Sequence, residues 1–177
     1  VADARDLLIA SVLCNDPVMY IDDRWLYDQE DELPPVVELN LTTQRPMVSI
    51  TGGDITIVAS GHASLLAREA AQQLENENVS VEVVDVRVLN PFHAEEIIES
   101  VKKTKNLLVV DSGWISGGFS AEVIAKVVEQ LPVDCLNNPP VRIALPDAPA
   151  PTSRVLEKAY YTSTDDVVKA VKKILNS

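Results

Sequence analysis

The alternation of apolar and polar residues becomes regular after residue 54. Short apolar runs at 55–59, 79–86, 107–110 and 141–145 predict buried strands. Between and after them, apolar residues recur at the spacing of one helix face: Leu66, Ala70 and Leu74; Ile97, Ile98 and Val101; Val123, Ile124, Val127 and Val128; and Val167, Val168, Val171 and Ile174. Strands that alternate with helices over short loops predict an α/β fold, a three-layer α/β/α domain with a mostly parallel sheet, over residues 48–177.

Residues 1–47 follow a different pattern. Asp3 is a candidate cap for a helix whose apolar face carries Leu7, Leu8 and Val12, and a short strand is expected at 18–21. Residues 28–47 combine an acidic run with three prolines and predict a linker. Because the first residues already lie in an amphipathic helix, we expect the chain to be cut from a longer one.

The composition excludes several classes of partner. With 15 basic and 27 acidic residues the net charge is −12, which repels nucleic-acid phosphates and anionic lipid. The acidity suits a basic protein partner or simply solubility. No apolar run approaches the roughly 20 residues that cross a bilayer. Cys14 and Cys135, far apart, indicate a reducing compartment, and we expect the cytoplasm or an organelle matrix.

The chemically active residue types form no recognised catalytic pattern. The two histidines, His62 and His93, lack metal companions at usable spacing, and no Gly-x-Ser-x-Gly elbow is present. His62 follows a predicted strand beside a glycine, where site residues often lie, but a structural role is favoured. Asp85 and Arg87 project to the same side of their strand, where their charges could pair or cap neighbouring backbone, and a structural role is favoured over a catalytic one.

Two loops follow predicted strands and are candidates for contacts. The glycine-containing loop 111–119 precedes a helix but matches no phosphate-binding motif. We interpret it as a structural turn with an exposed Trp114 that contacts another chain. The loop 146–151 has three prolines, Pro146, Pro149 and Pro151, which fix an extended conformation suited to an interface or to chain reversal.

The order of these motifs resembles the transketolase-type carboxy-terminal domain of thiamine-diphosphate-dependent 2-oxo acid dehydrogenase beta subunits. The resemblance covers nearly the whole chain and rests on the segments 53–58, 85–91, 100–104, 113–119, 146–149 and 172–176. Residues 2–27 are similar to the end of the preceding pyrimidine-binding domain. The resemblance therefore implies three parts: the end of that domain (1–27), a linker (28–47) and the transketolase carboxy-terminal-like domain (48–177).

The resemblance implies an assembly role rather than chemistry in this chain. Family enzymes use thiamine diphosphate and magnesium, which are held on other domains or on the alpha subunit, so we expect no catalytic or cofactor-binding residue here. Gly53-Asp54 is followed by Ile55 and is not the family's magnesium-binding Gly-Asp-Gly. Expected partners are a second copy, the alpha subunit or missing domains, and the acyltransferase binding domain, which implicates the carboxy-terminal Ser177.

The resemblance also implies a structural potassium ion at a helix-to-strand turn that matches Ser11, Cys14 and Asp16. Cys14 stands where aspartate is usual and Asp16 where asparagine is usual, but backbone carbonyls suit this hard cation. The alternative hypothesis is that the chain is a stand-alone, flavodoxin-like small-ligand-binding or dimerisation module without enzymatic activity. That module would need an open crevice at the strand ends.

Overall fold

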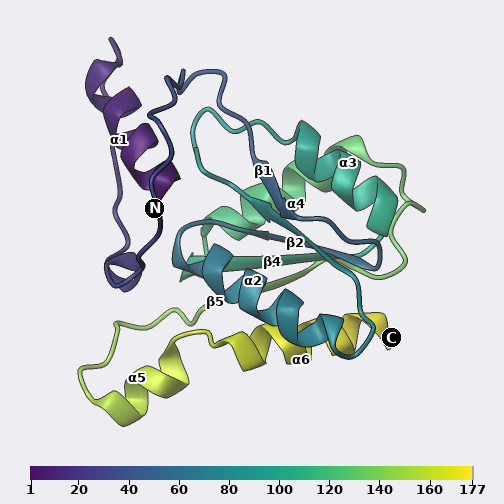
Figure 1. Ribbon diagram of the computed structural model, residues 1–177. Helices are drawn as coiled ribbons and strands as arrows, with labels where there is room; N and C mark the ends of the chain where they lie inside the picture. Colours follow the sequence, from purple (N-terminus) through teal and green to yellow (C-terminus); the bar gives the residue numbers. More distant parts are fainter. Residues whose placement is uncertain (177) are drawn as a thin grey trace.

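A five-stranded sheet forms the centre of the computed structural model, which describes residues 1–176 (Figure 1). Its strands are β1 (Met47–Ile50), β2 (Ile55–Ala59), β3 (Val81–Asp85), β4 (Leu107–Trp114) and β5 (Val141–Leu145), in the order β1-β3-β2-β4-β5. The pairs β3–β2, β2–β4 and β4–β5 are parallel, and β1 pairs antiparallel with β3. The prediction of a three-layer domain with a mostly parallel sheet is confirmed.

Two helices cover each face of the sheet. α2 (His62–Glu75) and α6 (Thr164–Leu175) lie on one face, and α3 (Glu95–Thr104) and α4 (Phe119–Gln130) lie on the other (Figure 1). Ile55 and Ile57 point towards α2 and α6, whereas Val58 packs with α3 and α4, as the two-residue repeat of a strand requires. Both faces of β2 are therefore buried, which explains why all of its residues except Thr56 are apolar, and the Thr56 hydroxyl is hydrogen-bonded to that of Thr104.

Residues 1–46 lie outside these layers and differ from the prediction in detail. α1 (Ala2–Leu13) forms as expected, but Val1 occupies the cap position and Asp3 lies inside the helix. The predicted apolar face is not buried: Leu8 and Val12 are exposed, and the buried residues of α1 are Asp6 and Ala10. The strand predicted at 18–21 is wrong, because this segment is extended without a partner strand.

Several elements were not anticipated. The sequence analysis missed β1 and the short helix α5 (Arg154–Tyr160). It also missed a 3-10 turn, η1 (Arg24–Leu26), within residues 1–46, which are called the first segment below. β4 continues to Trp114 because its last residue pairs with Leu145 beyond a register shift. Among residues 1–176, every helix is too short or too polar to span a bilayer.

Candidate functional site

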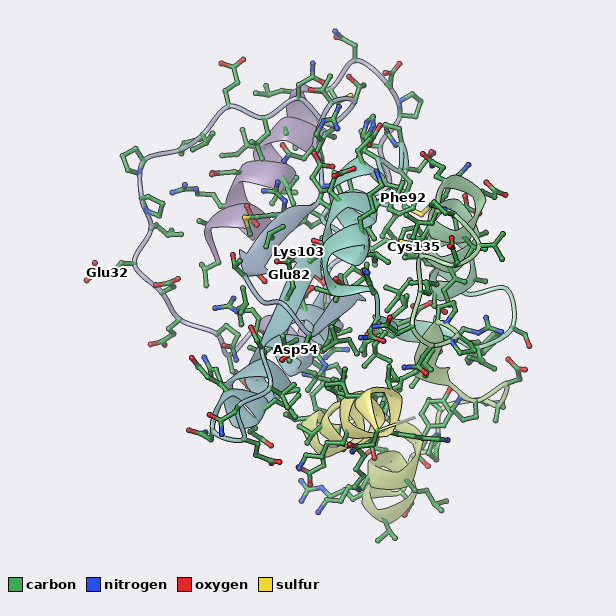
Figure 2. All side chains as sticks on the ribbon, turned by 90° about the vertical axis from the view of Figure 1, so that its right-hand side faces the viewer. Glu32, Asp54, Glu82, Phe92, Lys103 and Cys135 are labelled. Atoms are coloured by element: carbon green, nitrogen blue, oxygen red, sulfur yellow. The ribbon has the colours of Figure 1, made fainter. Side chains whose placement is uncertain are left out.

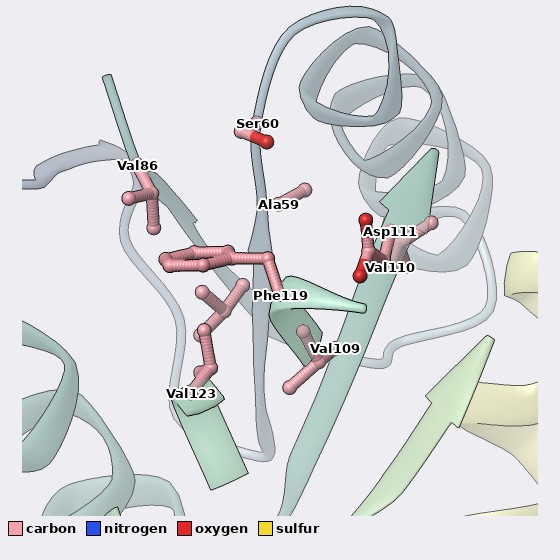
Figure 3. Close-up of a pocket in the computed structure, with 9 residues that line it drawn as sticks. Ala59, Ser60, Val86, Val109, Val110, Asp111, Phe119 and Val123 are labelled. Carbon is pink, nitrogen blue, oxygen red and sulfur yellow. The ribbon is translucent and has the colours of Figure 1, made fainter. Parts of the chain in front are cut away.

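The carboxyl ends of β2 and β4 mark the place where three-layer α/β proteins usually bind ligands. The chain passes from β2 to β3 on one side and then crosses to β4 on the other, so the strand order reverses between β2 and β4. The cavity at this point is only about 10 Å³, room for about one water molecule (Figure 3). It is lined by Val58, Ala59, Ser60, Val86, Val109, Val110, Asp111, Phe119 and Val123. This cavity is too small for the ligand that the stand-alone ligand-binding alternative places at the strand ends.

A carboxylate of the chain itself closes the glycine-containing loop after β4. Asp111 accepts a hydrogen bond from the Ser120 N–H at 2.7 Å, at the start of α4, and another from the Gly113 N–H at 2.8 Å. Gly118 has no room for a side chain, because a Cβ would lie 2.2 Å from the Trp114 carbonyl oxygen. The loop is therefore a structural turn, and its position for an anion at the helix start is filled by Asp111.

A second carboxylate fills the corresponding position at the start of α2. Asp23 accepts a hydrogen bond from the His62 N–H at 3.1 Å, and its other oxygen accepts one from the Trp25 N–H at 3.1 Å. The His62 ring stacks on Trp25 with ring centroids 5.6 Å apart. His62 therefore has a partner from the first 46 residues, and its contacts are structural.

Asp85 and Arg87 do not form the direct pair that the sequence suggested. Asp85 accepts a hydrogen bond from the Ser64 hydroxyl at 2.7 Å. Burial raises the pKa of Asp85, and the Ser64 bond and nearby guanidinium groups only partly oppose this. Arg87 instead forms an ion pair with Asp3 at 3.2 Å and donates to the Arg45 carbonyl at 2.9 Å.

Trp114 lies on the surface, with 55% of its area exposed. Its ring nitrogen donates to the Tyr160 hydroxyl at 3.1 Å, which in turn donates to the Ala148 carbonyl at 2.7 Å. Asp147 accepts hydrogen bonds from the Ser116 N–H and hydroxyl, which ties the loops after β4 and β5 together. The exposure that a partner contact requires is present, and the contact itself stays a prediction.

The proposed potassium ligands lie around the end of α1. The Ser11 hydroxyl donates to the Leu7 carbonyl at 2.7 Å, Cys14 is the extended residue that ends the helix, and Asp16 is exposed. The last carbonyls of a helix have no partner within it, so this turn offers oxygen donors to a hard cation. Over residues 1–176, no group of three or more His, Cys, Asp or Glu side chains could hold a metal ion. Ser177 lies outside the described residues.

A buried carboxylate on β3 was missed in the sequence. Glu82 is only 2% exposed and contacts the Ser100 hydroxyl, the Lys103 ammonium and the Gly52 N–H, the last at 3.2 Å. Figure 2 shows Glu82 and Lys103 side by side. A groove of about 520 Å³ lies over this network between β1 and α3, with Glu95, Glu96 and Glu99 among its lining residues. The sequence did carry a signal for Glu82, because an acidic residue within a run of buried strand residues indicates a paired, buried carboxylate.

Asp23 and Trp25 were also missed as contact residues. They lie in a polar segment that shows no periodicity, so their partners could not be inferred from spacing. The signal was weak: Trp25 is a large aromatic residue in a stretch otherwise typical of a loop.

Comparison with known proteins assigns the fold to a family. The family model described as "Transketolase, C-terminal domain" matches residues 47–167. The chain therefore belongs to the transketolase carboxy-terminal domain family, and the resemblance inferred from the motifs is confirmed.

The chain is also similar to particular pyruvate dehydrogenase subunits. The chain is 36% identical over 177 residues to the mitochondrial pyruvate dehydrogenase E1 component subunit beta of Caenorhabditis elegans, covering 98% of this chain and 50% of that protein. It is 34% identical over 173 residues to the same subunit of Rhizobium meliloti (strain 1021), covering 98% of this chain and 37% of that protein. The chain thus spans half or less of the length of these two relatives.

Solved structures agree with the fold. A split-gene transketolase, an inactive beta4 tetramer, superposes with a TM-score of 0.68 and 30% identity, covering 83% of this chain and 46% of that one. A 2-oxoglutarate:ferredoxin oxidoreductase from Magnetococcus marinus superposes with a TM-score of 0.54 at 16% identity, covering 75% of this chain and 20% of that one, and supports the fold alone.

Proposed function

We propose that this chain is the carboxy-terminal scaffold and assembly part of a beta-type subunit of a thiamine-diphosphate-dependent 2-oxo acid dehydrogenase, inactive alone. The observation that carries the proposal is the 36% identity to a pyruvate dehydrogenase E1 beta subunit across 98% of the chain, the first 46 residues included. Under this proposal residues 1–27 end the pyrimidine-binding domain, 28–47 form the linker and 48–177 form the assembly domain. The mitochondrial and bacterial relatives support an organelle matrix or the cytoplasm as its location.

Thiamine diphosphate and magnesium belong to the complete enzyme in this proposal, and the poor fit of a diphosphate to the strand-end region supports this. The strand-end cavity of about 10 Å³ is far smaller than the 300–1,000 Å³ typical of small-molecule sites. The two helix starts beside it, where a diphosphate would find N–H donors, already bind the carboxylates of Asp23 and Asp111.

Exposed apolar residues on the first segment support assembly with other chains or domains. Val12, Leu13, Met19 and Ile21 are each at least 70% exposed. Apolar side chains gathered on one segment are typical of surfaces that a partner covers. The proposed partners are a second copy, the alpha subunit or the rest of the same subunit, and the acyltransferase binding domain near Ser177.

The proposal is tested by calorimetry and light scattering on the 177-residue chain. We expect no saturable heat when thiamine diphosphate and magnesium are added, because the positions for the diphosphate are filled. We expect the mass of a dimer by size exclusion with light scattering. Saturable cofactor binding would contradict the scaffold role, and a monomer at every concentration would contradict the assembly role.

We also propose that potassium binds at the turn of Ser11, Cys14 and Asp16. Replacing NaCl by KCl at equal ionic strength should raise the temperature of unfolding by about 2 °C, because an ion that binds only the folded chain stabilises it. The Asp16→Ala variant should lose this difference, whereas Asp28→Ala, at an exposed acid in the linker, should keep it. Equal unfolding temperatures in the two salts would exclude the site.

A further inference from the structure

The edge of the sheet that usually binds a ligand in this type of fold here contacts the chain's own first segment. We propose that two contacts, Asp23 and Trp25 with His62, and Asp3 and Arg45 with Arg87, form a clasp that fixes the orientation of residues 1–46 on the domain. Asp23 and Arg87 are then positioning residues. The inference does not depend on the proposed function, because it rests on contacts within this chain.

The first contact combines a charge with aromatic stacking. The Asp23 carboxylate joins η1 to α2, because one oxygen accepts the Trp25 N–H and the other accepts the His62 N–H. A carboxylate is favoured at a helix start by the unpaired N–H groups and by the helix dipole. Trp25 then lies between two rings of the domain, stacked on His62 and edge-on to Tyr161 at a centroid distance of 5.8 Å.

The second contact lies after β3, separated along the chain from the first. The Arg87 side chain is only 14% exposed and uses one terminal nitrogen on Asp3 and the other on the Arg45 carbonyl. A buried guanidinium is costly unless it is paired, so contact with both partners is favoured. Because Asp3 and Arg45 lie near the two ends of the first segment, Arg87 attaches both ends to the domain. Arg45 continues the attachment through an ion pair with Glu96 on α3 at 3.2 Å.

Two separate contacts restrict rotation as well as distance. A segment joined at one point could swing about it, but the contacts at His62 and at Arg87 fix α1 relative to the sheet. Figure 1 shows α1 standing beside the layers rather than packed into them. Its exposed residues Leu8, Val12 and Leu13 are therefore presented in a set direction. The clasp thus attaches the first segment to the domain at the edge of the sheet where ligands usually bind in this type of fold.

The first contact is tested by the hydrogen exchange of the His62 amide and by the exposure of the Trp25 ring. In a Trp114→Phe background, Trp25 is the remaining tryptophan, so its quenching by acrylamide reports the exposure of this ring alone. Asp23→Ala should speed hydrogen exchange of the His62 amide about fivefold, the effect expected on losing a capping carboxylate. Because Trp25 is already 61% exposed, its quenching should rise by no more than about one half. Asp22→Ala is the matched control, because Asp22 binds the Tyr27 hydroxyl within the first segment.

Unfolding followed by far-UV circular dichroism distinguishes loss of the first contact from a loss of stability of the whole domain. The unfolding midpoint of Asp23→Ala should lie no more than about 4 °C below that of Asp22→Ala, because the cost to the domain is the loss of one helix cap. Arg87→Met should increase hydrogen exchange across α1, and Arg87→Lys should restore part of the protection through its charge. The proposal is overturned if the His62 amide and Trp25 are unchanged in Asp23→Ala, if Asp22→Ala has the same effect, or if the midpoint of Asp23→Ala falls by much more than the loss of one helix cap explains.

Discussion

Glu82→Ala should lower the free energy of unfolding by about 3 kcal/mol, because it leaves two buried donors without an acceptor. These donors are the Ser100 hydroxyl and the Gly52 N–H. Lys103 is 46% exposed, so water screens its contribution and most of the loss falls on the two buried groups. Urea unfolding followed by circular dichroism measures the change. Glu99→Ala, at an exposed carboxylate on the same helix face as the groove, should change stability by less than about 0.5 kcal/mol.

The same residue gives stability a defined pH dependence. Burial alone would raise the pKa of Glu82, but the Lys103 ammonium, the Ser100 hydroxyl and the Gly52 N–H outweigh it, and the pKa lies below its usual value. The ionised side chain therefore contributes stability that is fully present above the ordinary pKa of a glutamate, and this contribution is lost as the pH falls through the lower folded-state pKa. Glu82→Gln should remove this part of the acid dependence. An unchanged profile would contradict the assignment.

Gly52→Ala should be the most damaging glycine substitution next to this network, at a cost of about 3 kcal/mol. A Cβ on Gly52 would lie 2.2 Å from the Val81 carbonyl carbon and 2.5 Å from the Glu82 nitrogen, so β3 would have to move. The movement would also weaken the bond from the Gly52 N–H to Glu82.

The neighbouring glycine provides a matched control. Gly53 is exposed, and a Cβ there would meet nothing within 4 Å. Gly53→Ala should therefore leave the free energy of unfolding within about 0.5 kcal/mol of the wild type. Thermal unfolding of the two variants side by side measures the contrast, and similar losses in both would show that the close approach of Gly52 to β3 is not what matters.

The layered domain could be predicted because its elements carry strong periodic signals. The four parallel strands were found from apolar runs, and helices such as α6 from repeats such as Val167 and Val171. β1 was missed because four residues beside a proline-rich segment give too short a pattern, and its pairing with β3 depends on residues more than 30 positions away. The segment 18–21 has an apolar pattern but no partner strand, and its Tyr20 hydroxyl donates to the Ala4 carbonyl of α1 instead.

The contacts at the strand ends were the least predictable part. The sequence placed His62 just after β2 and Arg87 at the end of the next strand, but their partners Asp23 and Asp3 come from a segment without a regular pattern. Long-range polar contacts of this kind depend on how the first segment crosses the sheet edge, and a single sequence carries no signal for that path. The potassium turn and the partner role of Trp114 remain predictions.

The antiparallel strand β1 has a consequence for how copies of this protein can meet. It is four residues long, its register with β3 shifts between Val48 and Ile50, and the Ser49 hydroxyl donates to the Val83 carbonyl. A short, irregular border strand is a poor template for another chain's backbone, so it protects the parallel strands behind it from edge-to-edge aggregation. At this edge of the sheet, copies of the protein can therefore associate through helix surfaces and side chains, but not readily through a continuous intermolecular sheet.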